Sequence, residues 1–176
     1  MPDMTVPLLI LSGPVGVGKS SVGDELSVKL MEQWVPHSFI DLDALAQTFP
    51  RPAGDPYGSR LALKNMADVW RNCRAAGARN LIVARVVETA AEREAIAAAV
   101  PGSRTTLCHL RASEATLLAR VRQREMGAGL DWHLKRTLEL ARSLEETCPF
   151  DLAVEADNRS LKDIAEDLCD QMTWES

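Results

Sequence analysis

The stretch that most limits how this chain can fold is residues 8–21, LLILSGPVGVGKSS, where an apolar run gives way to glycine, lysine and serine. The apolar part, residues 7–12, is typical of a strand that is buried on both faces of a parallel sheet. Residues 13–20 then match the pattern G-x-x-x-x-G-K-[ST], whose glycines allow successive backbone N–H groups to point at a phosphate. We therefore expect a phosphate-binding loop directly after a buried strand.

The loop and the helix after it are predicted to bind the phosphates of a nucleotide. Lys19 is placed to reach the β and γ phosphates, and the hydroxyl of Ser20 is placed to be a ligand of Mg²⁺. Apolar residues at four-residue steps predict a helix over about residues 19–33, and its positive N-terminal end adds attraction for an anion. A glycine turn without a ligand would not need the Gly-Lys-Ser triplet in register with the helix start. The predicted nucleotide-binding residues of the loop are Gly13, Val15, Gly16, Val17, Gly18, Lys19, Ser20 and Ser21.

The size and charge of the chain narrow the classes of function. Its 176 residues fit one domain, predicted to span residues 1–176, and its 46% hydrophobic and 26% charged residues are typical of a folded globular protein. A net charge of −5 gives no overall basic field for duplex DNA or long RNA, so nucleic acid is not the expected partner. The sequence shows neither a long apolar run nor the pattern of a secretory signal, so we expect no membrane contact and a cytoplasmic location.

Strands and helices alternate along the rest of the sequence. Short apolar runs predict four more strands, and helical periodicity predicts helices between them. Residues 49–59, rich in proline and glycine, are expected to form an irregular loop. Because parallel strands need helical crossovers, this pattern favours an α/β three-layer sandwich with a mainly parallel sheet. The predicted strands lie at residues 38–40, 81–84, 105–110 and 152–154, and the predicted helices at 62–76, 89–99, 113–125, 132–146 and the C-terminus.

The phosphate-binding motif resembles that of P-loop nucleoside triphosphate hydrolases and kinases. In length and layout the chain resembles the small P-loop kinases, a group that includes shikimate, gluconate, adenylylsulfate and nucleoside monophosphate kinases and chloramphenicol phosphotransferase. This resemblance implies a five-stranded parallel sheet of order 2-3-1-4-5, a helical lid at approximately residues 120–136, and ATP and Mg²⁺ as cofactors. It also implies a small-molecule acceptor substrate, which the sequence does not identify.

Two carboxylates follow the second predicted strand in the sequence FIDLD. Asp41 and Asp43 come at the carboxyl end of this strand, at the edge of an open parallel sheet where ligands bind. By the resemblance, Asp43 orients the acceptor hydroxyl or acts as a general base, and Asp41 belongs to the outer shell of the metal, although the two roles are exchangeable. Alternatively, Asp43 caps the turn at residues 44–46, a position that suits aspartate.

Arginines gather in the predicted lid. The sequence LLARVRQR places Arg120 and Arg124 one turn apart on one helix face. Phosphoryl transfer depends on cations that meet the charge of the γ-phosphoryl oxygens, and the resemblance predicts that Arg120, Arg124 and Arg136 approach the nucleotide. The alternative is a solvated basic face near a helix C-terminus. The predicted catalytic residues are Lys19, Asp43, Arg120 and Arg124, the predicted metal ligands are Ser20 and Asp41, and Arg120 is also predicted to bind the nucleotide.

The chain departs from the family pattern after the third predicted strand. Many P-loop proteins carry a magnesium-binding aspartate there, but this chain has ARVVE at residues 84–88. The outer shell of the metal is then left to Asp41 or Glu88. Arg85 and Arg51 are predicted either to clamp an anionic acceptor or to form surface ion pairs.

Three functions fit these residues. The first is an ATP- and Mg²⁺-dependent phosphotransferase that moves the γ-phosphoryl group of ATP to a hydroxyl or phosphate of a small molecule. The second is a nucleotide-binding switch or regulatory ATPase without such an acceptor, although the sequence lacks the N-K-x-D motif of switch GTPases and its D-x-x-G at residues 55–58 follows a proline-rich loop. The third is a nucleic-acid end kinase, which the acidic balance of the chain disfavours.

Overall fold

Five parallel strands form the centre of the molecule in the computed structural model, which describes residues 5–124, 129–147 and 150–176. The strand order is β2-β3-β1-β4-β5, so the predicted fold class and the order implied by the resemblance are confirmed. In chain order the elements are β1 (Val6–Ser12), α1 (Lys19–Glu32), β2 (His37–Asp41), the short 3-10 helix η1 (Ala44–Ala46), α2 (Ser59–Ala75), β3 (Asn80–Ala84), α3 (Ala90–Ala98), β4 (Ser103–Arg111), α4 (Glu114–Arg124), α5 (Leu130–Thr147), β5 (Leu152–Glu155) and α6 (Leu161–Gln171).

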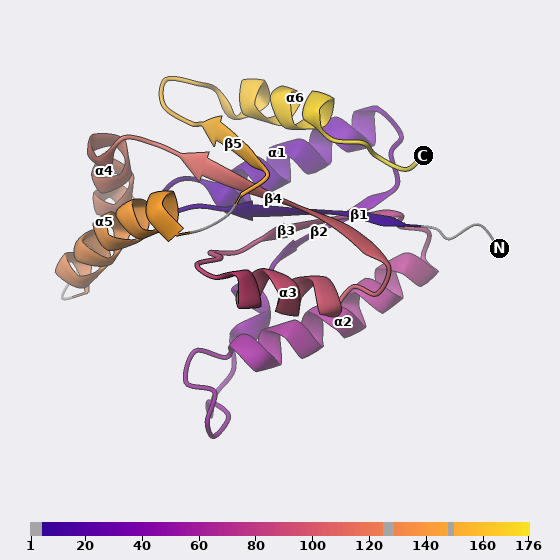
Figure 1. The fold of residues 1–176 in the computed structure, drawn as a ribbon, viewed down its shortest axis with the longest axis horizontal. Coiled ribbons are helices and arrows are strands. Elements are labelled where there is room, and N and C mark those ends of the chain that lie inside the picture. The colour runs from indigo at the N-terminus through magenta and orange to yellow at the C-terminus, as the bar shows by residue number, and fades with distance from the viewer. Residues whose placement is uncertain (1–4, 125–128, 148–149) are drawn as a thin grey trace.

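Helices cover both faces of the sheet and make it the middle layer of three, with α1 and α6 on one side and α2 and α3 on the other (Figure 1). Every residue of β1 is buried, which is why its sequence is apolar without alternation. Successive side chains point to opposite faces: Leu8 packs in a core cluster with Met66 of α2, whereas Leu9 packs in a second cluster with Leu26 of α1. The strand thus joins two hydrophobic cores.

The carboxyl ends of β1 and β3 are tied together where the chain leaves the sheet. The hydroxyl of Ser12, the last residue of β1, accepts a hydrogen bond of 2.9 Å from the backbone N–H of Val87. Two residues earlier, the backbone N–H of Arg85 donates to the carbonyl of Leu11 at 3.1 Å. The segments that follow β1 and β3 therefore lie side by side at the edge of the sheet where ligands bind in folds of this type.

Helices α4 and α5 stand beyond the carboxyl ends of the strands rather than on a face of the sheet (Figure 1). The predicted lid covers the end of α4 and the start of α5, and most of the predicted glycine break at residues 127–129 lies outside the described residues. Other boundaries differ slightly from the prediction: β4 begins at Ser103, because the polar residues that open it pair with β1. Among the described residues, no helix is long and apolar enough to cross a bilayer.

Candidate functional site

The loop between β1 and α1 is shaped by glycines that no other residue can replace without strain. Gly13, Gly16 and Gly18 have φ angles of +145°, +84° and +105°. A Cβ added at Gly13 would lie 2.5 Å from the carbonyl oxygen of Leu110, and one at Gly16 would lie 2.9 Å from Cγ2 of Val121. The loop is therefore pressed against β4 and α4, and it needs glycine both for its backbone angles and for this close packing.

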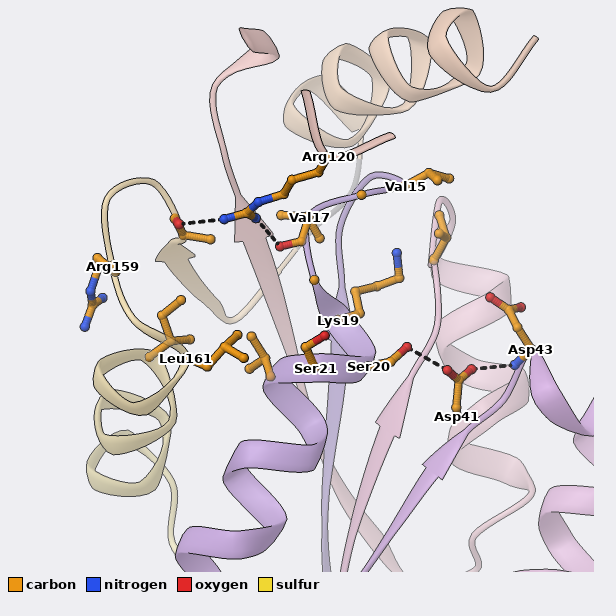
Figure 2. A pocket seen from close by; sticks show the side chains of 16 residues that line it. Val15, Val17, Lys19, Ser20, Ser21, Asp41, Asp43, Arg120, Arg159 and Leu161 are labelled. Atoms are coloured by element: carbon orange, nitrogen blue, oxygen red, sulfur yellow. Dashed lines mark hydrogen bonds between the residues drawn. The ribbon is translucent and has the colours of Figure 1, made fainter. Parts of the chain in front are cut away.

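Lys19 opens α1 and turns back over the loop (Figure 2). Its ammonium donates hydrogen bonds to the carbonyl oxygens of Gly13 at 3.0 Å and Pro14 at 3.2 Å. The charge therefore lies over the concave side of the loop, which lines a cavity of about 650 Å³. A cavity of this volume is within the range of small-ligand sites. All the predicted loop residues from Val15 to Ser21 line this cavity.

Ser20 and Asp41 meet at the end of β2, as Figure 2 shows. The hydroxyl of Ser20 donates to Oδ2 of Asp41 at 2.6 Å, and Oδ1 of Asp41 accepts the backbone N–H of Asp43 at 3.1 Å. One hydroxyl and one carboxylate, held in contact beside the phosphate loop, are oxygen donors of the kind that Mg²⁺ prefers. The donor set fits a magnesium ion that accompanies a bound nucleotide.

Asp43 lies on the same cavity and is bound by Arg85. Its side chain is 60% exposed, and the guanidinium of Arg85 donates to its Oδ1. Asp43 stands at the N-cap of η1, but its side chain makes no capping hydrogen bond, so the capping alternative is not supported. The ion pair between Arg85 and Asp43 joins the ends of β3 and β2.

The predicted lid arginines differ in whether they line the cavity. Arg120 lines the cavity and donates to the carbonyl oxygens of Val17 at 2.9 Å and Ala156 at 3.5 Å, so it spans the distance from the phosphate loop to the end of β5 (Figure 2). The side chain of Arg124 lies outside the described part of the structure. Arg136 is not among the cavity residues; its guanidinium binds Oε1 of Glu88 at 2.6 Å. Two candidates for the nucleotide site thus pair with each other instead.

One wall of the cavity was not foreseen from the sequence. It consists of residues after β5 and at the start of α6, and its side chains are Ala156, Arg159, Leu161 and Ile164. Arg159 is held by an ion pair with Asp167 at 2.7 Å. The signal that would have found this wall is positional, because the carboxyl end of β5 reaches the same edge of the sheet as β1 and β2.

Asp157 joins this wall to the start of α4. Its Oδ2 accepts the backbone N–H of Ser113, the residue before α4, at 2.8 Å. This hydrogen bond and those from the hydroxyls of Thr116 and Ser113 favour the ionised carboxylate and lower the pKa of Asp157. The start of α4 is thereby fixed to the segment that follows β5.

The sheet order and the glycine loop together define a P-loop nucleoside triphosphatase fold with the topology of small P-loop kinases. A family described as AAA domain matches residues 9–142, and the chain belongs to this family. A sequence comparison with curated proteins gave no significant match.

Solved structures share the fold at low sequence identity. A gluconokinase from Sinorhizobium meliloti 1021 is 21% identical with a TM-score of 0.58, over 94% of this chain and 90% of that one. The tunicamycin resistance protein of Deinococcus radiodurans is 18% identical with a TM-score of 0.63, over 94% and 95%. The adenylylsulfate (APS) kinase of Mycobacterium tuberculosis, solved with AMPPNP and APS, is 18% identical with a TM-score of 0.60, over 94% and 96%. At these identities the likeness shows the fold.

Proposed function

We propose that the protein is an ATP-dependent phosphotransferase that moves the γ-phosphoryl group of ATP to a hydroxyl of a small molecule. The observation that carries this proposal is that Lys19, Ser20 and Asp43 line one cavity of about 650 Å³. A nucleotide tail on the loop and an acceptor beside Asp43 would then face each other. A gluconokinase and an APS kinase solved with AMPPNP and APS share this fold, and this likeness supports a kinase.

In the proposed reaction, the acceptor's oxygen attacks the γ phosphorus of ATP. A new O–P bond forms while the bond from the γ phosphorus to the β,γ-bridging oxygen breaks, ADP leaves, and the hydroxyl proton passes to the carboxylate of Asp43. Asp43 suits this role because it follows the carboxyl end of β2, lines the cavity and has an exposed side chain. The cavity thus supplies a proton acceptor beside the phosphate loop.

The remaining residues bind and orient the phosphates. The loop amides and Lys19 would hold the β and γ phosphates, and Arg120 stands next to the loop through its bond to Val17. Ser20 and Asp41 would hold Mg²⁺, directly and through its outer shell; when bound, the ion neutralises phosphate charge. None of these residues forms a covalent bond to the substrate, as expected for a transfer that depends on position and charge.

Two substitutions test this function. Lys19→Ala is expected to abolish ATP binding in isothermal titration calorimetry, because the loop loses the cation that meets the phosphates.

Asp43→Asn is expected to retain ATP binding but to lower turnover by roughly 10²- to 10⁴-fold, the usual contribution of a general base. The matched control is Asp24→Asn, which changes an exposed carboxylate of α1 outside the cavity. Full turnover by Asp43→Asn, or ATP hydrolysis that no acceptor stimulates, would contradict the proposal.

A further inference from the structure

A second, smaller cavity of about 60 Å³ lies beside Asp43, at the end of β3 and between α2 and α3. Its walls are mostly apolar, and their apolar side chains are Leu42, Leu63, Val86, Ala95 and Ile96. Val86 also lines the large cavity, so the two spaces adjoin. This volume is well above what one water molecule needs, and apolar walls offer water few hydrogen bonds. The small cavity therefore suits an apolar group of a ligand that enters from the large one.

Polar side chains that line the small cavity already form hydrogen bonds within the protein. Oε2 of Glu92 accepts the backbone N–H groups of Glu88 at 2.7 Å and Thr89 at 3.1 Å, and it thereby caps α3. The hydroxyl of Ser59, at the start of α2, accepts a hydrogen bond of 3.0 Å from Nη2 of Arg85. Within the described residues that line this cavity, Arg85 is the only cation.

Arg85 lines the small cavity and is bonded to Asp43, which lines the large one. Its backbone is bonded to Leu11, its Nη1 donates to Asp43 and its Nη2 donates to Ser59. The side chain is 20% exposed, so it is largely enclosed but is still accessible beside Asp43. Each terminal nitrogen of a guanidinium carries two N–H groups in one plane, which matches the two oxygens of a carboxylate. An anion beside Asp43 would meet this plane.

We propose that the small cavity and Arg85 select the acceptor, and that the acceptor is a small hydroxy acid with a short branched apolar side chain. Its carboxylate binds Arg85, its apolar group fills the small cavity, and its hydroxyl faces Asp43. This inference rests on the proposed function and gives its acceptor a chemical class. A polyhydroxylated acid fits poorly, because each hydroxyl that enters the apolar cavity without a partner lowers affinity by about tenfold or more.

The first experiment compares four compounds on the full chain with ATP and Mg²⁺: 2-hydroxy-3-methylbutanoate, its primary amide, glycolate and gluconate. Coupled detection of ADP gives kcat/KM, and calorimetry with AMPPNP gives binding. We expect 2-hydroxy-3-methylbutanoate to bind and to exceed its amide by about 10- to 100-fold in kcat/KM, the usual loss when a charged hydrogen bond is removed. Glycolate lacks the apolar group and therefore measures what that group contributes. Gluconate measures how strongly a polyhydroxylated acid is excluded.

Variants then separate the two parts of the inference. Arg85→Met is expected to remove the preference for the acid over its amide while the Kd for ATP is unchanged, and Arg85→Lys is expected to keep part of the preference. Ala95→Leu fills the small cavity, so it should impair 2-hydroxy-3-methylbutanoate and spare glycolate. The matched control is Arg74→Met, which changes an exposed arginine of α2 that does not line this cavity.

The outcomes distinguish this inference from the function on which it rests. If the protein binds ATP but prefers gluconate or the amide, or does not bind 2-hydroxy-3-methylbutanoate at millimolar concentration, the inference is overturned and the proposed function stands. If the folded protein binds no ATP, the proposed function itself is overturned. An acid preference that survives in Arg85→Met would also overturn the role of Arg85.

Discussion

The proposed nucleotide side of the cavity comes mainly from one continuous stretch, residues 15–21, whereas the proposed acceptor side is assembled from residues far apart in the sequence. The first side is built from backbone: its glycines have positive φ angles that allow the loop to pack against β4 and α4. The second is built from side chains, and Asp43, Ser59 and Arg85 are held by bonds to one another. A site built from backbone therefore requires particular residues at consecutive positions. A site built from side chains requires particular residues only at separate positions that the fold brings together.

The largest effect is expected at the backbone side. Gly13→Ala should lower the free energy of unfolding by about 2–5 kcal/mol, because a strained backbone and an overlap with a fixed carbonyl add together. The matched control is Gly77→Ala: Gly77 has a φ of +110°, and no heavy atom of the described residues beyond its chain neighbours lies within 4 Å of an added Cβ, so only the backbone strain remains, about 1 kcal/mol. Urea denaturation measures both, and equal losses would show that the close packing of the loop has no energetic weight.

A smaller effect is expected where the two sides meet. Asp41→Asn removes the charge that accepts the hydroxyl of Ser20 and should weaken ATP binding by about 10- to 100-fold when Mg²⁺ is present, as for other outer-shell ligands. Without Mg²⁺ the variant and the wild-type protein should bind ATP alike. Calorimetry in magnesium and in EDTA makes this comparison, and an equal loss in both would assign Asp41 a structural role only.

The lid arginines test how far the nucleotide side extends. Arg120→Met should weaken ATP binding by about tenfold, because a charged hydrogen-bonding group leaves the edge of the loop. Arg136→Met removes a similar side chain whose partner, Glu88, is outside the cavity, and it should leave ATP affinity unchanged. If Arg136→Met has the larger effect, Arg136 leaves Glu88 when the nucleotide binds.

The smallest effect is expected on the stability of the sheet itself, outside both sides of the cavity. His109 is buried in β4 against Phe150, and burial lowers its pKa from the ordinary value of 6.5. The unfolded chain thus binds this proton at a higher pH than the folded one, so stability is complete above pH 6.5 and falls as the pH drops below 6.5 towards the folded pKa. Urea denaturation over this window should show the loss, and His109→Gln should flatten it. An unchanged slope in the variant would assign the loss to other groups.

The sequence was most informative where structure depends on local order. The parallel sheet followed from apolar runs separated by helices, and the phosphate loop followed from its glycine spacing. The resemblance supplied the strand order. The sequence did not show that Arg136 pairs with Glu88, because each long side chain had several partners in reach and only the packing of α5 decides between them. The wall formed by Arg159 and Leu161 was missed for a similar reason: it becomes part of the site only when β5 joins the sheet.

Arg120 offers one consequence for how such a protein can change over time. Within the described part of the chain it donates hydrogen bonds to the carbonyl groups of residues 17 and 156, and every amino acid provides a carbonyl group. Replacing the side chain at either position leaves the acceptor in place, provided that the backbone keeps its course. These two hydrogen bonds therefore tolerate substitutions at residues 17 and 156, and they are lost by mutation chiefly at Arg120.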